Sequence, residues 1–332
     1  MQSIQLKRRE FITLVGGAAA CPVAARFARA QAYPSRPITI VVPFAAGGPT
    51  DTIARILAER MRAFFGQTVL VENVTGANGS IGVGRVARAA PDGYTLSIGQ
   101  TGTHVLNGAS YSLQYHVLDD FEPISLLTDS PLLVVGKKSL PPDKLKDLID
   151  WLRANPNTAT AGTPGNGSLG QTSLILFQKI TGTQFQFAAY RGSAPVVQDL
   201  VAGQVDLAIV DPITTLPQVR AGKIKAYAVA GKVRLAKAPE IPTAEEAGVS
   251  GLSVSFWHGL WAPRGTKKEI IARLNEAVVN ALSNPDVRTR MADLSQDLFP
   301  REQLTPEGLA AHHKAEIEKW WPIMRAAAIK AE

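Results

Sequence analysis

Short apolar runs alternate with amphipathic segments from Pro37 onward, and loops rich in glycine separate them. The first run, at 38–44, is followed by the sequence AAGGPTD and by a segment in which Ile53, Ile56 and Leu57 share one face of a helix. The same order of strand, glycine loop and helix then recurs along the chain. Alternation of this kind predicts an α/β fold with a largely parallel sheet.

A second block of this alternation runs from 131 to 230, and the rest of the chain supplies one more strand and three helices. The apolar stretches near 124–135 and 224–230 are placed to carry the chain between two lobes. We therefore expect a hinged, two-lobed α/β fold with an interlobe ligand cleft. Its first lobe comprises residues 33–130 plus 231–332, and its second lobe residues 131–230.

The first 32 residues have the pattern of an export signal. A basic start with Arg8 and Arg9 precedes an apolar run, and small residues follow at 30–32 in an A-x-A pattern, with 28–30 as a competing cleavage site. The paired arginines resemble the twin-arginine type, which exports folded chains. We expect residues 1–32 to be cleaved and the mature protein to lie in a bacterial periplasm.

Charge and cysteine content narrow the class of partner. The signal holds five of the 35 basic residues and one of the 28 acidic residues, so the mature chain carries a net charge of only +3. This low net charge argues against a nucleic-acid partner.

The single cysteine, Cys21, lies inside the signal. A lipid anchor at Cys21 would need a large aliphatic residue where Ala18, Ala19 and Ala20 stand. No metal or cofactor motif is found, so we expect neither, and we expect a monomer.

Three loops share one construction, in which a strand ends, a glycine turn follows and a helix opens on a hydroxylated residue. They lie at 45–50, 76–80 and 163–168. In open α/β sheets the ligand crevice lies outside the carboxyl ends of the strands, where such loops meet. Helix N-termini offer unpaired N–H groups to anions, and glycine lets the backbone approach a ligand. The pattern predicts a site for a small carboxylate, held largely by main-chain donors.

Few side chains suggest catalysis, since no nucleophile elbow, zinc-protease motif or phosphate loop occurs. His104 either contacts a ligand or stabilises its own loop. Asp211 either faces the crevice or caps the next helix, and Arg191 pairs with a carboxylate or with a surface group. His312 and His313 lie on a charged amphipathic helix and are expected to face solvent.

The segments VPFAAGGPTD, ENVTGANGSIG, APDGYTLSIGQTGTH, AGTPGNGSLG and YRGSAPVVQDLVAGQVDLAIVD occur in that order. Together they resemble the solute receptors of tripartite tricarboxylate transporters, also called Bug receptors, over essentially the whole chain from residue 33. The resemblance implies a type II periplasmic binding-protein fold that closes on a small carboxylated solute, often with the help of ordered water. It also implies delivery of that solute to the inner-membrane permease subunits of such a transporter.

The resemblance assigns ligand contacts to positions in five loops. Three departures from the usual pattern, namely GANG for GAGG, Gln171 for a histidine and LQYHVL for LPYDPL, mean that the identity of the solute cannot be copied from a relative. The implied ligand-binding residues are Phe44, Gly47, Gly48, Thr50, Asp51, Asn78, Gly79, Ser80, Thr101, Thr103, His104, Gly165, Asn166, Gly167, Ser168, Tyr190, Arg191 and Asp211.

The sequence thus favours a periplasmic receptor that is not an enzyme. Two alternatives remain open at this stage. One is a solute sensor that signals to a membrane kinase, because a sensor and a transport receptor would use the same closed surface. The other is a secreted enzyme that acts on a carboxylated metabolite, with His104 and Asp211 as its acid and base.

Overall fold

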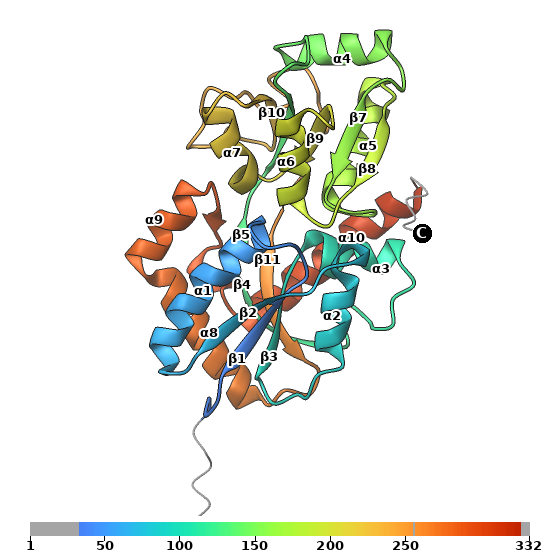
Figure 1. The fold of residues 1–332 in the computed structure, drawn as a ribbon. Coiled ribbons are helices and arrows are strands. Elements are labelled where there is room, and N and C mark those ends of the chain that lie inside the picture. The colour runs from blue at the N-terminus through green and yellow to red at the C-terminus, as the bar shows by residue number, and fades with distance from the viewer. Residues whose placement is uncertain (1–32, 255, 327–332) are drawn as a thin grey trace, which may run out of the picture. The chain divides into compact units, whose positions relative to one another are not determined.

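The computed structural model describes residues 33–254 and 256–326, whose helices and strands are drawn in Figure 1. The predicted export signal, residues 1–32, lies outside the described residues. Within the described ranges, no helix is both long enough and apolar enough to cross a membrane.

The first sheet has five strands, and its three parallel strands come from the N-terminal part of the chain. The late strand β11 inserts between β3 and β4 and runs antiparallel to both. Helices α1 and α8 pack against each other on one side of the sheet, and α2 lies on the other (Figure 1). The strand order is β2 (Val69–Asn73), β1 (Ile38–Val42), β3 (Thr95–Gln100), β11 (His258–Pro263) and β4 (Phe121–Leu126), and the helices are α1 (Pro49–Phe65), α2 (Ser80–Ala87), α8 (Lys268–Ser283) and α10 (Pro306–Ala326).

The second sheet is built from one continuous stretch of chain. Strand β7 is parallel to β8 and β9, whereas β6 is antiparallel to β9 and β10. The strand order is β10 (Ile224–Ala230), β6 (Leu132–Lys137), β9 (Leu207–Val210), β7 (Thr160–Thr163) and β8 (Gln186–Ala189), and the helices are α4 (Leu145–Ala154), α5 (Leu169–Thr181), α6 (Ser193–Ala202) and α7 (Pro212–Arg220).

Several short elements lie outside the two five-stranded sheets. Strands β5 and β12 form a separate two-stranded ladder, and a π-helical segment, η2, follows β3 and leads into α3. These elements are η1 (Ala77–Gly79), η2 (Gly102–Leu106), α3 (Asn107–Ser110), β5 (Thr128–Asp129), α9 (Pro285–Asp293), β12 (Asp297–Leu298) and η3 (Arg301–Gln303).

The mixed α/β fold class is confirmed, but the sheets are less parallel than the alternation predicts. A parallel strand buried on both faces reads as a continuous apolar run, and Ile38, Ile40 and Val42 of β1 are fully buried in this way. Strands that follow a crossing between the sheets enter from the opposite direction and therefore pair antiparallel. Helix α1 ends at Gly66, a glycine that caps the helix in the left-handed conformation with φ +66°.

The chain crosses between the two sheets twice. The first crossing, between β4 and β6, lies inside the predicted stretch 124–135. The second does not lie at 224–230, because that stretch is strand β10, and the chain returns between 231 and 257. The crossings pair with each other, since Phe256 N donates to Ser130 O at 2.8 Å and Ser130 N to Phe256 O at 3.1 Å. The lobes, as units that move separately, stay a prediction.

The expectation that His312 and His313 face solvent was wrong. Helix α10 packs against β4 and η2, and His313 is only 3% exposed. His312 is half-buried, with its ring against Trp257 and Phe299. The Nε2 atom of His313 donates to His104 O at 2.6 Å, and the Trp321 indole donates to Val105 O at 2.9 Å. The helical pattern was misleading because His313 and Trp321 pack against η2 and each donates a hydrogen bond to one of its carbonyl groups.

Three buried histidines, His104, His258 and His313, predict that the protein loses stability in acid, because burial lowers the pKa of each. Burial lowers the pKa of His313 to about 4 and that of His258, between Thr50 and Thr128, to about 3. An unfolded histidine has a pKa of about 6.5 and so binds a proton that the folded one does not. As the pH falls from about 6.5 toward 4, each histidine should therefore remove about 1.4 kcal/mol of unfolding free energy per pH unit.

Urea denaturation at several pH values measures this slope. His313→Gln keeps a donor for His104 O and should reduce the slope by the share of one histidine, whereas His116→Gln, at an exposed histidine, should leave it unchanged. An unchanged slope in His313→Gln would show that the acid sensitivity arises elsewhere.

Candidate functional site

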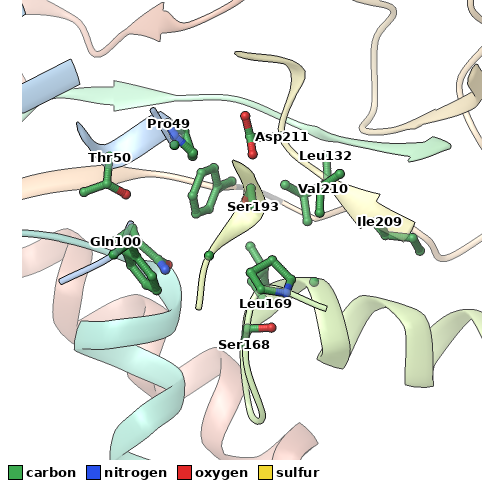
Figure 2. A pocket seen from close by; sticks show the side chains of 16 residues that line it. Pro49, Thr50, Gln100, Leu132, Ser168, Leu169, Ser193, Ile209, Val210 and Asp211 are labelled. Atoms are coloured by element: carbon green, nitrogen blue, oxygen red, sulfur yellow. The ribbon is translucent and has the colours of Figure 1, made fainter. Parts of the chain in front are cut away.

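A cavity lies where the loops of both sheets meet (Figure 2). Its walls come from the segments that follow β1, β7, β8 and β9, together with the end of β3, the start of β6 and the second crossing. These are the carboxyl ends of parallel strands, where an α/β fold presents a ligand site. The lining residues are Phe44, Gly48, Pro49, Thr50, Gln100, Leu132, Pro164, Ser168, Leu169, Gly170, Gly192, Ser193, Ile209, Val210, Asp211 and Phe256.

Four helices begin at this cavity. The first residues of α1, α5, α6 and α7, or the residues that cap them, all belong to its lining. The first N–H groups of a helix have no partner inside the helix, and the helix dipole places partial positive charge there. Four such ends around one cavity favour a bound anion.

The lining carries no cationic side chain. Among the sixteen described lining residues there is no lysine, arginine or histidine, and Asp211 alone is ionisable. Neutral polar groups come from Thr50, Gln100, Ser168 and Ser193. Gly102 N donates to Oε1 of Gln100, so the Nε2 amide is the donor that this side chain offers a ligand. The cavity therefore suits an anion held by main-chain N–H groups, hydroxyls and one amide.

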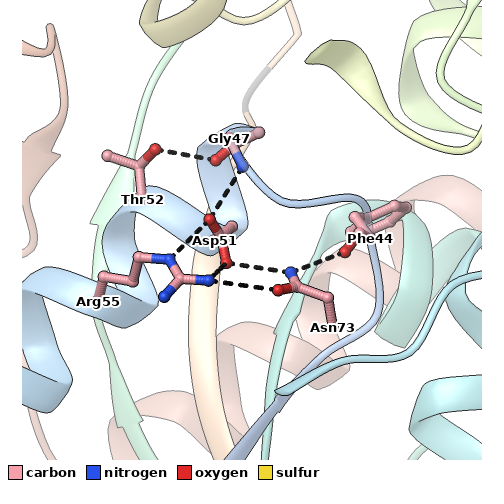
Figure 3. Close-up of polar contacts among 7 residues, drawn as sticks. Phe44, Gly47, Asp51, Thr52, Arg55 and Asn73 are labelled. Carbon is pink, nitrogen blue, oxygen red and sulfur yellow. Dashed lines mark hydrogen bonds and ion pairs between the residues drawn. The ribbon is translucent and has the colours of Figure 1, made fainter. Parts of the chain in front are cut away.

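Asp51 anchors the first loop instead of lining the cavity (Figure 3). Its Oδ2 accepts from Gly47 N at 2.9 Å and from Arg55 Nε at 2.9 Å, and its Oδ1 accepts from Asn73 Nδ2 at 3.0 Å. Asn73 Nδ2 also donates to Phe44 O at 3.0 Å. Burial alone would raise the pKa of Asp51, but the hydrogen bonds from Arg55, Gly47 and Asn73 outweigh it and lower the pKa. The loop is thus fixed at both of its ends.

The loops of the two sheets touch beside the cavity. Ala45 N donates to Arg191 O at 3.3 Å, and the Tyr111 hydroxyl donates to Asn166 O at 2.5 Å. Glycine stands at the close approaches. A Cβ atom on Gly167, whose φ is +70°, would lie 2.7 Å from Ser110 Oγ. The backbone there requires glycine both for its conformation and for space.

The structure brings the predicted site residues together in two groups. Five of them line the cavity, namely Phe44, Gly48, Thr50, Ser168 and Asp211, and Gly47 adjoins it. A second group meets where the 76–80 and 163–168 loops touch, since a Cβ on Gly165 would lie 3.0 Å from Asn78 Oδ1. Those loops hold Asn78, Gly79, Ser80, Gly165, Asn166 and Gly167.

The remaining predicted residues have other partners. His104 is fully buried and stacks on Trp261 with ring centroids 3.9 Å apart, which is the loop-stabilising alternative. It does not share the cavity with Asp211, so the acid and base pair of the enzyme alternative is not assembled. Thr101 and Thr103, at the start of η2, are fully buried. Tyr190, Arg191 and Asp51 are absent from the described lining, and the Tyr190 hydroxyl instead donates to Asp199 at 2.6 Å.

Sequence reasoning missed several lining residues. Ser193 follows Gly192 at the start of α6, so the strand, glycine and helix construction used for the other loops also applies to RGS. Gln100 is the last residue of β3, and a polar residue at the carboxyl end of a parallel strand could have been predicted to face the ligand crevice. Phe256 lies in the second crossing and Leu132 at the start of β6, and no local pattern marks either residue as a cavity residue.

Two five-stranded mixed sheets with a ligand cavity where their loops meet define the class of periplasmic binding proteins. The solved structure of the periplasmic binding protein BugD matches with a TM-score of 0.87 and 36% identity, over 90% of this chain and 100% of that one. MatC from Rhodopseudomonas palustris with bound malate matches with a TM-score of 0.85 and 40% identity, over 88% and 99% of the two chains. Rpa4515 from R. palustris with adipate matches with a TM-score of 0.86 and 34% identity, over 90% and 99%.

Residues 53–328 match the sequence model of the tripartite tricarboxylate transporter family receptors. The chain belongs to this family, as its motifs indicated. The resemblance to the Bug receptors is confirmed by the family match and by the likeness to BugD.

Replacing the anchor of the first loop should destabilise the protein. Asp51→Asn removes the charge that Arg55 and Gly47 N share, at a residue that is 3% exposed. We expect a loss of about 1–3 kcal/mol of unfolding free energy, measured by urea denaturation. Glu59→Gln on the same helix breaks an exposed ion pair with Arg290 and should cost less than about 1 kcal/mol. Equal losses in the two variants would contradict the anchoring role.

Proposed function

We propose that this protein is a periplasmic receptor that captures a small carboxylate and delivers it to a tripartite tricarboxylate-type membrane permease. The observation that carries the proposal is the meeting of four helix N-termini around a cavity whose described lining has no side-chain cation. Family membership supports it, as do the malate in MatC and the adipate in Rpa4515. Export by the signal at 1–32 is part of the proposal.

The proposed binding site combines predicted and newly found residues. One end of the solute lies against the start of α1 and α5, where Thr50 and Ser168 stand, with Gln100 and Ser193 as further donors. Apolar side chains, among them Phe44, surround the body of the solute. The residues of the 76–80 and 163–168 loops, which touch beside the cavity, hold the site shut.

Closure follows from the two crossings and the loop contacts. We propose that the two sheets belong to lobes that hinge at the paired crossings near Ser130 and Phe256. The bonds from Ala45 to Arg191 and from Tyr111 to Asn166 then form in the closed state. A solute shifts the population toward that state by its differential affinity for it. The closed lobes present the surface that the permease binds.

The function is tested by thermal unfolding of residues 33–332 with a panel of mono-, di- and tricarboxylates, aromatic acids and amino acids. A ligand present at about 100 times its Kd should add about 2.7 kcal/mol of stability and raise the Tm. Recovery of unchanged ligand after long incubation distinguishes binding from turnover. A flat panel on folded, ligand-free protein would contradict the proposal.

Gly48→Asp should abolish binding while the fold persists. Gly48 caps α1 in extended backbone, and a Cβ there would meet only Ala45 O, at 3.4 Å. The added carboxylate faces the anion and should weaken binding at least about 100-fold in calorimetry. Gly48→Ala adds the same Cβ without charge and should change affinity only a few-fold. Retained affinity in Gly48→Asp would place the anion elsewhere.

Gly167→Ala should weaken binding by preventing full closure. Its new Cβ would clash with Ser110 Oγ across the loop contact. Gly182→Ala is a matched control, because Gly182 has a similar φ of +64° and open space around it. Both variants should lose about 1–2 kcal/mol of stability from the left-handed backbone. Only Gly167→Ala should lose affinity, by roughly tenfold, and equal affinities would argue against closure at this contact.

A further inference from the structure

The Asp211 carboxyl is a feature that a site for plain anions does not need. It lines the cavity, is 1% exposed and is the only ionisable side chain among the described lining residues. A carboxylate brought beside a buried carboxylate is repelled, because the interior screens charge less than water does. The cavity thus combines four anion-favouring helix ends with one group that opposes a purely anionic ligand.

Capping does not account for the charge of Asp211. Its Oδ1 accepts from Thr214 N at 2.9 Å as the N-cap of α7. Serine and asparagine cap as well as aspartate does, and this chain uses Ser168 at α5 and Asn284 at α9. An uncharged cap would therefore serve α7 and would spare the cavity a negative group.

The carboxyl accepts hydrogen bonds from neutral donors. The Thr214 hydroxyl lies 3.2 Å from Oδ1 and 3.1 Å from Oδ2, and the Ser193 hydroxyl and the N–H of Asp211 itself also bond this carboxyl. With Thr214 N these are four donors, none of them charged, so no cation in the described lining balances the charge of the carboxylate. Burial raises the pKa of Asp211 and the hydrogen bonds from Thr214 and Ser193 offset this only in part, as expected for a buried carboxyl without a cationic partner.

We propose that Asp211 selects solutes that carry a hydrogen-bond donor, a hydroxyl or an ammonium group, in addition to the carboxylate bound by the helix N-termini. The solute class is then hydroxy- or amino-substituted carboxylic acids with a short aliphatic body. This inference rests on the proposed function. The relatives do not decide it, since MatC holds a hydroxy acid and Rpa4515 an unsubstituted one. A site built to bond a donor rejects the analogue that lacks it, because its polar group is left unpaired.

Calorimetry with matched acids at pH 7.5 tests this selection on residues 33–332. The pairs are malate with succinate, 2-hydroxyglutarate with glutarate, and aspartate with succinate. In each length class that fits the cavity, the hydroxy or amino acid should bind at least about tenfold more tightly. Comparison of malate with aspartate then separates the hydroxyl from the ammonium group.

Asp211→Asn is the informative variant. Asparagine keeps the N-cap on Thr214 N and the side-chain volume, but its amide donates where the carboxylate accepts. The preference for the donor-bearing acid should fall at least about tenfold, with tighter binding of the unsubstituted acid. The Tm without ligand should stay close to that of the wild type. Asp143→Asn, at a side chain that is 83% exposed, should leave the preference unchanged.

Three outcomes would overturn the inference in distinguishable ways. If no carboxylate binds the folded wild type, the proposed function is wrong and the inference falls with it. If both members of each pair bind equally and Asp211→Asn does not change their ratio, the receptor function stands and the selection is wrong. If the unsubstituted acids bind as tightly with uptake of a proton, shown in buffers of different ionisation enthalpy, a protonated Asp211 donates to the ligand and selection by a donor is wrong.

Discussion

The meeting of four helix starts at one cavity is the constraint on which the rest of this structure depends. The helices begin there because parallel strands from both sheets end there and each strand leads through a short loop into its helix. Main-chain donors cannot be moved one at a time as side chains can. The sheet registers, the loop lengths and the glycines at the loop contacts together therefore fix where the four helix starts meet.

The loops around the cavity are fixed by polar groups that lie outside the cavity lining. Asp51 and Asn73 fix the first loop through Gly47 N and Phe44 O, and the last helix binds the carbonyls of η2 through His313 and Trp321. Asp51 and His313 are buried, Asn73 and Trp321 are half-buried, and all four are hydrogen-bonded, so they act as rigid supports behind the site. Asp51 shows how a residue in a ligand-binding motif can serve the motif by shaping its backbone.

The sequence predicted the fold class and the loops because both depend on local patterns. Apolar runs such as Ile38 to Val42 mark buried parallel strands, and glycine before a hydroxylated residue marks a helix start. Two cavity residues, Leu132 at the start of β6 and Phe256 in the second crossing, could not be found in this way, because tertiary contacts alone bring them to the site. The burial of His313 was missed for a related reason: its partner is a carbonyl of η2, 209 residues away in the chain. Asp211 left two interpretations open, and the structure shows that it both caps a helix and lines the cavity.

The insertion of β11 between β3 and β4 constrains the order in which the molecule can be assembled. The second sheet uses only residues 132–230, so its strands are all available once that stretch has been synthesised. The first sheet lacks its fourth strand until residues 258–263 exist, and η2 lacks its support until α10 follows. Contacts between such distant segments form slowly. Folding is therefore expected to finish with the C-terminal part of the chain, after nearly all of the chain has been synthesised. This order agrees with the twin-arginine signal predicted at the N-terminus, because that type of signal exports chains that have already folded.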